Sequence, residues 1–201
     1  MENIVLIDMG HGRLTAGKRS PAHPDFMPFR EYEFNREIGE ELMRVLSKYP
    51  DILTMPTIEN PNTGDVLQTR VNFANQIIKE HPKRNYLFLS IHANAFGTTW
   101  NTANGVEVFV SKNASANSKT AAAIFQRNLV DETGLIDRCH PRKYKQANFY
   151  VLKNTVCPAV LVECGFYTNL KEMYFLRSAA GKGKILRALE QSILEYFKIN
   201  T

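Results

Sequence analysis

Tyr86-Leu87-Phe88-Leu89-Ser90-Ile91 is an almost uninterrupted apolar run of strand length. Such a run is typical of a strand covered on both faces, as in the sheets of α/β proteins. Ile4-Val5-Leu6-Ile7 and Ala159-Val160-Leu161-Val162 repeat the pattern near the two ends of the chain. The three runs therefore predict the buried centre of a sheet.

Further elements follow from the pattern between these runs. Additional strands are expected at residues 52–55, 106–110 and 149–152, the second of them nearer an edge because it contains a glutamate. Apolar residues at helical spacing predict helices through residues 34–46, 66–77, 121–129 and 185–197. Asp65 is a predicted N-cap, and Asn169 with Glu172 matches a capping box for a short helix. Alternating strands and helices indicate an α/β fold, in a single domain spanning residues 1–201.

Length and composition agree with a globular protein that has one hydrophobic core, and the sequence also bears on where the protein is made. The chain has 201 residues, of which 44% are apolar and 22% charged. Residues 1–8 carry no basic segment followed by a long apolar stretch, so no signal peptide is predicted, and no apolar run is long enough to span a bilayer. We expect synthesis in the cytoplasm, no membrane insertion and a monomer.

Charge and cysteine content exclude other classes of function. The net charge of +5 favours polyanionic partners, but no helix-turn-helix, RRM or KH signature accompanies it, so nucleic-acid binding is not predicted. The three cysteines, Cys139, Cys157 and Cys164, form no CxxC pair. We interpret all three as free thiols.

Two histidines follow predicted core strands. His11 lies between Gly10 and Gly12 directly after the first run, and His92 closes the run that begins at Tyr86. Ligand sites of open α/β sheets gather beyond the carboxyl ends of strands, where the two imidazoles could converge on a metal. Taken singly, each histidine could equally be a structural residue.

Carboxylates could complete such a site. Glu31 and Glu33 open the first predicted helix, where either could be a metal ligand or could simply favour the helix dipole. Two histidines and one carboxylate leave a position open for water, which is the pattern of a catalytic zinc site. Glu163 ends the apolar run at residues 158–162, and a base that takes a proton from the attacking water would explain a carboxylate there. The alternative is a salt bridge to an arginine.

Four segments of the chain resemble the signature blocks of zinc-dependent N-acetylmuramoyl-L-alanine amidases of the amidase-3 type. They are Asp8-Met9-Gly10-His11-Gly12, Glu31-Tyr32-Glu33-Phe34-Asn35, Ser90-Ile91-His92-Ala93-Asn94-Ala95 and Val162-Glu163-Cys164-Gly165-Phe166-Tyr167-Thr168-Asn169. Weaker likeness fills the gaps, so the resemblance spans nearly the whole chain in order. The segment Gly17-Lys18-Arg19-Ser20-Pro21 is similar to phage and prophage members, which favours an endolysin-like branch.

The resemblance implies a mixed sheet of about six strands flanked by helices on both faces. It implies that His11, Glu31 and His92 bind Zn²⁺ and that Glu163 assists the attacking water. Glu31 is chosen over Glu33 because the family spacing Glu-x-x-x-Asn fits Glu31 and Asn35. The substrate would be peptidoglycan, cut between N-acetylmuramic acid and L-alanine.

Three other readings stay open at this point. The same zinc site could cut a peptide bond within the stem peptide, or the chain could be a cell-wall-binding module without catalysis. A nucleic-acid binder is the third and rests on charge alone. If the chain is a lytic enzyme made without a signal peptide, it would reach the wall by a holin-dependent route or by lysis.

Overall fold

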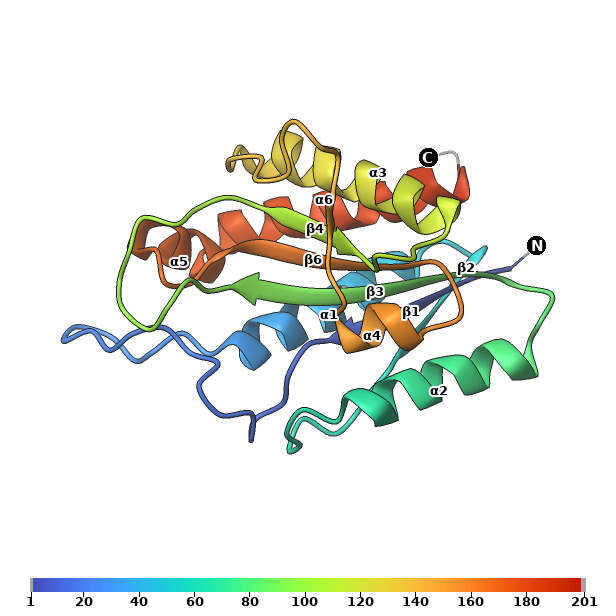
Figure 1. Cartoon of the computed structure of the whole chain (residues 1–201), viewed down its shortest axis with the longest axis horizontal. Helices are drawn as coiled ribbons and strands as arrows, with labels where there is room; N and C mark the ends of the chain where they lie inside the picture. Colours follow the sequence, from blue (N-terminus) through green and yellow to red (C-terminus); the bar gives the residue numbers. More distant parts are fainter. Residues whose placement is uncertain (1, 200–201) are drawn as a thin grey trace.

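The three apolar runs form neighbouring strands at the centre of a mixed sheet in the computed structural model, which describes residues 2–199 (Figure 1). The strands are β1 (Asn3–Met9), β2 (Ile52–Pro56), β3 (Asn85–Asn94), β4 (Glu107–Val110), β5 (Lys145–Gln146) and β6 (Ala159–Phe166). Within the described residues they form a six-stranded sheet in the order β2-β1-β3-β6-β4-β5. Only the β4–β6 pairing is antiparallel.

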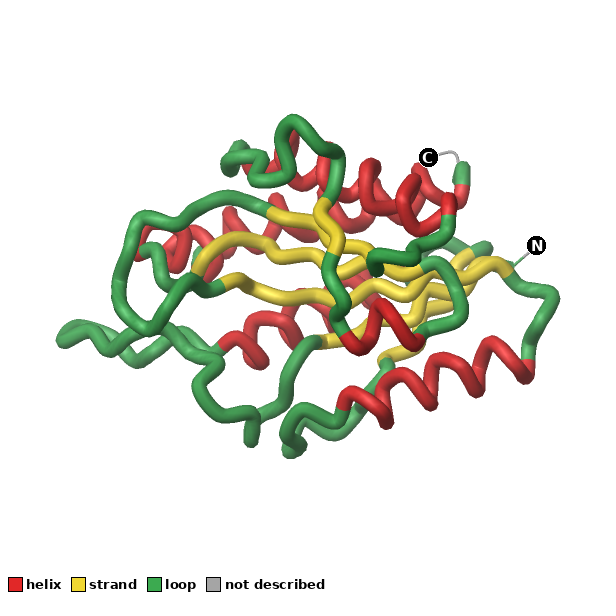
Figure 2. The backbone as a smooth tube through the Cα atoms, viewed as in Figure 1, coloured by secondary structure: helices red, strands yellow, loops and turns green. Residues whose placement is uncertain are grey.

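Helices cover both faces of this sheet, which confirms the predicted fold class (Figure 2). They are α1 (Glu31–Leu46), α2 (Leu67–Glu80), α3 (Ala116–Thr133), α4 (Tyr150–Asn154), α5 (Leu170–Arg177) and α6 (Ala179–Phe197). α1, α3, α5 and α6 pack on one face, and α2 and α4 pack on the other. No helix among residues 2–199 is both long and apolar enough to cross a membrane.

Side-chain alternation along the central strands carries polar residues onto the face covered by α2. Ile4 and Leu6 of β1 belong to the apolar cluster on that face, and Asp8 follows two residues later. On β6, Leu161 belongs to the same cluster and is followed in the same way by Glu163. Each strand is therefore apolar along its length and polar at its carboxyl end, on one shared face.

The strand predicted at residues 149–152 is wrong, because this segment forms helix α4. Val151 and Leu152 are consecutive and both buried against the α2 face, whereas Phe149 and Tyr150 are partly exposed. Burial of two neighbouring residues suits a short helix better than the alternating burial of a strand. The edge strand is instead the two-residue β5, which pairs with the end of β4.

Two predicted helix caps turn out differently. Asp65 does not cap α2, whose N-cap is Val66 without a side-chain hydrogen bond, because the Asp65 carboxylate pairs with His11. Asn169 does cap α5, since its side chain accepts hydrogen bonds from the backbone N–H groups of Lys171 and Glu172. The reciprocal half of that capping box is absent among the described residues, because the Glu172 carboxylate accepts from the N–H groups of Gly105 and Phe166 instead.

Candidate metal centre

His11 is held in a strained turn at the carboxyl end of β1. Its φ of 62° lies in the left-handed region, which residues other than glycine rarely adopt. Side chains from two helices hold the carbonyl groups around it: Asn35 donates to Gly10 O (2.9 Å), and Arg70 donates to Met9 O (2.7 Å) and His11 O (2.6 Å). These bonds fix the direction in which the His11 imidazole leaves the sheet.

The His92 ring lies directly over the backbone of that turn. A Cβ atom at Gly10 would come within 2.1 Å of His92 Cε1, so only glycine leaves room for the imidazole. The rings of His11 and His92 meet edge to face, with 4.9 Å between their centroids. The sequence Gly10-His11 thus brings the two histidines together.

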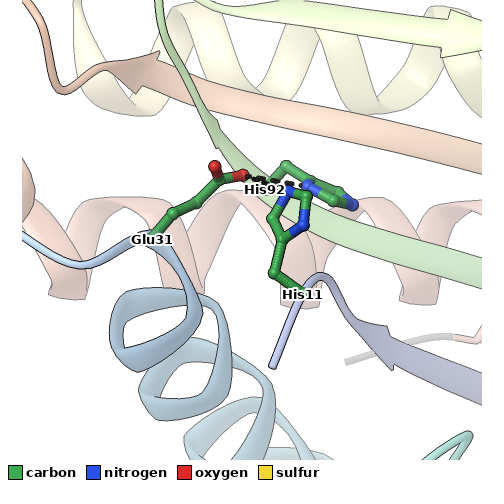
Figure 3. Close-up of side chains that lie close together, drawn as sticks. All are labelled: His11, Glu31 and His92. Carbon is green, nitrogen blue, oxygen red and sulfur yellow. Dashed lines mark hydrogen bonds and ion pairs between the residues drawn. The ribbon is translucent and has the colours of Figure 1, made fainter. Parts of the chain in front are cut away.

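Glu31 supplies a carboxylate between the two rings. It is the first residue of α1 and only 2% of its side chain is exposed. Its Oε1 lies 3.2 Å from His11 Nε2 and 3.0 Å from His92 Nδ1 (Figure 3). One ligand atom from each of the three residues lies within 4.8 Å of the others, which is close enough to hold one metal ion.

Glu33, the other carboxylate considered from the sequence, lies away from this cluster. Its side chain is 57% exposed and accepts a hydrogen bond from the hydroxyl of Tyr32. Two residues along a helix point about 200° apart, so Glu31 and Glu33 cannot serve the same site. Only Glu31 of the two faces the histidines.

The cluster concentrates negative charge on Glu31. Burial would raise the pKa of the Glu31 carboxyl, but hydrogen bonds from His11 and His92 outweigh it and hold the pKa far below its usual range. Burial also works against a charged His11, yet the hydrogen bond and charge of Glu31 raise the pKa of that imidazole. An ionised carboxylate that raises the pKa of the His11 imidazole would equally attract a metal cation.

A second layer of polar groups holds the outer nitrogen of each ring. His11 Nδ1 donates to Asp65 Oδ1 at 2.8 Å, and His92 Nε2 lies 3.1 Å from Ser90 Oγ. Sequence reasoning missed both contacts. Asp65 lies 54 residues from His11 along the chain, and an aspartate after a glycine before a helix looks like an N-cap. Nothing in the local sequence marks Ser90, two residues before His92, as a partner of that ring.

Glu163 lies beside His92 because β3 and β6 run in parallel with these two residues in register. Its Oε2 is buried and has no hydrogen-bond partner among residues 2–199. Burial raises the pKa of the Glu163 carboxyl well above its usual value, and the negative charge of Glu31 raises it further. A buried, unpartnered carboxylate of this kind is unusual outside functional sites.

The salt bridge considered as an alternative role for Glu163 is absent from the described part of the chain. Arg70, the buried arginine nearby, pairs instead with Asp8, where Nη1 and Oδ1 lie 2.8 Å apart. The guanidinium of Arg138 pairs with Glu107, the neighbour of Glu163 on β4. Both arginines are thus committed to other carboxylates, and Glu163 faces the cavity.

A cavity of about 260 Å³ is lined by His11, Glu31, His92 and Glu163. Leu67, Phe149 and Tyr150 form an apolar wall on the side of α2 and α4, and Lys18 and Tyr167 also line it. Lys18 and Tyr167 line a second hollow of about 730 Å³ as well, bounded by residues 16–22 and 97–98. The two cavities share these lining side chains and are therefore neighbours, so a chain-like ligand could extend from the histidines over the loop before α1.

The family model for N-acetylmuramoyl-L-alanine amidase, Amidase_3, matches residues 5–195. The chain belongs to the Amidase_3 family. Among curated relatives, the N-acetylmuramoyl-L-alanine amidase LytC of Bacillus subtilis (strain 168) is 33% identical over 96% of the chain. The match covers 35% of LytC, so the chain spans about a third of that relative's length.

Solved Amidase_3 structures share the whole fold of this chain. A crystal structure of an N-acetylmuramoyl-L-alanine amidase from Clostridium difficile 630 superposes with a TM-score of 0.84, at 28% identity, and covers 100% of this chain and 99% of that one. The catalytic domain of CwlV, from Bacillus (Paenibacillus) polymyxa var. colistinus, gives a TM-score of 0.80 at 28% identity, with 100% of both chains covered. This Amidase_3 chain therefore matches a complete catalytic domain.

None of the three cysteines is among the residues that line this cavity, and all three are free thiols, as predicted. Burial raises the pKa of the Cys157 thiol to about 12 and also raises the pKa values of Cys139 and Cys164. Such thiols stay protonated near neutral pH and are poor nucleophiles.

Proposed function

We propose that this chain hydrolyses the amide bond between the lactyl group of N-acetylmuramic acid and L-alanine in peptidoglycan, and that it uses zinc to do so. The observation that carries the proposal is the convergence of His11, Glu31 and His92 in one cavity with the unpartnered Glu163. Membership of the Amidase_3 family supports the identity of the bond.

The donor set fits zinc. Two imidazole nitrogens and one carboxylate oxygen are ligands that zinc accepts, and three protein ligands leave a position free, as in catalytic zinc sites. His11 would bind through Nε2 and His92 through Nδ1, because their other nitrogens already contact Asp65 and Ser90. Bound zinc would lower the pKa of a water molecule and polarise the carbonyl group of the substrate.

Glu163 would accept and then donate the proton that moves during the reaction. Burial and the negative charge of Glu31 raise the pKa of the Glu163 carboxyl above the usual value, which makes the carboxylate a stronger proton acceptor. We assign it the transfer of a proton from the attacking water to the nitrogen of the departing L-alanine. No group among residues 2–199 hydrogen-bonds its Oε2, so the carboxyl is not committed to another partner.

The shape of the site suits a polymer that carries both sugars and peptides. The apolar wall of Leu67, Phe149 and Tyr150 offers a surface for the flat faces of sugar or peptide groups. On the far side, Lys18 lines both hollows and its side chain is 43% exposed, so it can meet a carboxylate of the stem peptide. Peptidoglycan fits this combination better than a small neutral amide.

One enzymatic and one non-enzymatic alternative can be tested against the amidase proposal. A peptidase that cuts within the stem peptide would use the same residues, and a wall-binding module would need none of them. The buried Glu163 disfavours the second, because an unpartnered buried carboxylate costs stability and serves no purpose in a binding surface. We further propose an endolysin-like role, as a monomer that is made in the cytoplasm and reaches the wall by a holin-dependent route or by lysis.

Digestion of purified sacculi tests the proposal. The protein should release intact stem peptides that begin with L-alanine, as read by mass spectrometry of the soluble fragments. A chelator should stop the release and added zinc should restore it. Full activity in chelator, or fragments that retain L-alanine on muramic acid, would contradict the proposal.

A further inference from the structure

A row of polar side chains runs beneath His92 across three parallel strands. Asp8 of β1 and Ser90 of β3 are direct partners in the sheet, and Thr57 follows β2 on the other side of Asp8. The hydroxyl groups of both neighbours bond the same carboxylate: Thr57 Oγ1 donates to Asp8 Oδ1 at 2.7 Å, and Ser90 Oγ donates to Asp8 Oδ2 at 2.6 Å. All three residues are buried.

Asp8 is held as a carboxylate by Arg70. The Arg70 side chain is 1% exposed and its Nη1 lies 2.8 Å from Asp8 Oδ1. A buried ion pair with two additional hydroxyl donors satisfies the carboxylate only in its ionised form, in which it is a pure acceptor. The proton between Ser90 and Asp8 must therefore come from the Ser90 hydroxyl.

This commitment decides the role of Ser90 toward His92. Ser90 and His92 are two residues apart on β3, so their side chains share one face, and Ser90 Oγ lies 3.1 Å from His92 Nε2. Since its one proton is given to Asp8, Ser90 can only accept at this contact. His92 Nε2 must then carry a hydrogen. In the neutral form of the ring, which is the form that binds a metal, the lone pair is therefore on Nδ1, the nitrogen that lies 3.0 Å from Glu31 Oε1.

We propose that Ser90 is a positioning residue that fixes the tautomer and ring orientation of His92, with Asp8 and Arg70 as its anchor. His11 is fixed in the opposite tautomer by Asp65, which accepts from Nδ1 and leaves the lone pair on Nε2. The two imidazoles thus turn different nitrogens toward Glu31, each set by its own partner. The proposal rests on the zinc site proposed above.

Thr57 provides a matched control for Ser90. Thr57→Val and Ser90→Ala each remove one buried hydroxyl bond to Asp8, but only Ser90 also touches His92. Both variants should lose a similar free energy of unfolding in the metal-free protein, because each removes one buried hydrogen bond to Asp8. Only Ser90→Ala should weaken zinc binding, about 10–100-fold by analogy with other outer contacts of metal-binding histidines.

The test of Ser90 uses two measurements, and neither of them is enzyme activity. Zinc affinity is measured by competition with a chromophoric chelator. Nitrogen-15 NMR of the histidine rings in the zinc-loaded wild-type protein should show the hydrogen of His92 on Nε2 and that of His11 on Nδ1. An equal loss of zinc affinity in Ser90→Ala and Thr57→Val, unchanged affinity in Ser90→Ala, or a hydrogen on His92 Nδ1 would overturn this inference while leaving the zinc site intact. A wild-type protein that binds no zinc would overturn both proposals.

Discussion

Glu31 and Glu163 are two carboxyls of one cavity whose surroundings shift their pKa values in opposite directions. Burial disfavours the charge of both, but Glu31 gains hydrogen bonds from two imidazoles, whereas Glu163 Oε2 has no partner among the described residues. Two carboxyls with separated pKa values are suited to separate tasks. We assign Glu31 to the metal and Glu163 to the proton.

Replacing Glu163 by Gln should abolish catalysis and preserve the metal site. The substitution keeps the shape of the side chain and removes the proton acceptor, so kcat should fall by about 10²–10⁴-fold. Zinc content, measured on the same preparation, should match that of the wild-type protein. Glu33→Gln is the control, since Glu33 is exposed on the same helix as Glu31 and should stay fully active. Loss of zinc from Glu163→Gln would make Glu163 a ligand instead.

The same variant gives a pH-dependent change in stability in the metal-free protein. The raised pKa of Glu163 means that folding favours its protonated form, so its contribution is complete below the unfolded value of about 4.3. That contribution is lost as pH rises toward the folded pKa, because a bare charge must then be buried. Glu163→Gln should therefore match the wild-type free energy of unfolding near pH 4 and exceed it at pH 8, by about 1 kcal/mol or more. Denaturant titrations at both pH values measure this, and a variant less stable than wild type at pH 8 would refute the account.

Asp65→Ala should weaken zinc binding without much effect on the fold. Asp65 is partly exposed, and it accepts the hydrogen that fixes the His11 ring. The expected loss of zinc affinity is about 10–100-fold. Asp25→Ala is the matched control, because Asp25 contacts a different histidine, His23, in the loop before α1. Equal zinc affinities for the two variants would remove Asp65 from the site.

Residue types and their position after strands were enough to single out His11, Glu31, His92 and Glu163 as candidates. The residues around them escaped prediction because their roles depend on tertiary contacts. Arg70 falls within the helix predicted at residues 66–77, yet its side chain is fully buried and reaches Asp8 and the His11 turn. A charged residue on a predicted core face is a signal that a buried partner exists elsewhere.

Helices and strands were predicted correctly where the sequence pattern fits only one kind of secondary structure. β1, β3 and β6 each contain one of the three long apolar runs, and a strand buried on both faces explains such a run. β5 has only two residues, Lys145 and Gln146, so it is too short for a sequence pattern to predict its pairing at the edge of the sheet. α4 was predicted as a strand because four consecutive apolar residues suit either structure at that length.

Asn169 is expected to stabilise the protein in two ways that can be separated. Its side-chain oxygen caps α5, and its Nδ2 donates to Ala103 O in the loop after β3. Asn169→Ala should lose both and lower the free energy of unfolding by about 1–2 kcal/mol, whereas Asn169→Asp should keep the cap and lose less. Thermal unfolding measures both, with Asn113→Ala as an exposed control. An Asn169→Asp protein as unstable as Asn169→Ala would show that the cap contributes little.

At the scale of the molecule, the sheet brings together residues that lie far apart along the chain. The parallel strands β1 and β3 place His11 and His92 at their carboxyl ends, and the start of α1 adds Glu31 (Figure 3). Glu163 lies beside His92 on β6, which runs parallel to β3. This convergence could be predicted from the sequence, because strand ends in a parallel sheet meet. The course of residues 12–30 could not, since that loop is held by individual contacts such as Trp100 Nε1 donating to Ala22 O.

The central claim is that the site at the carboxyl ends of β1, β3 and β6 hydrolyses the bond between muramic acid and L-alanine. Labelling of new amino termini on digested sacculi tests it most directly. The account predicts that L-alanine is the dominant new terminus, that no new reducing sugar appears, and that Glu163→Gln produces neither. A dominant new terminus other than alanine would contradict the account and indicate a peptidase, and new reducing ends would indicate cleavage of the glycan.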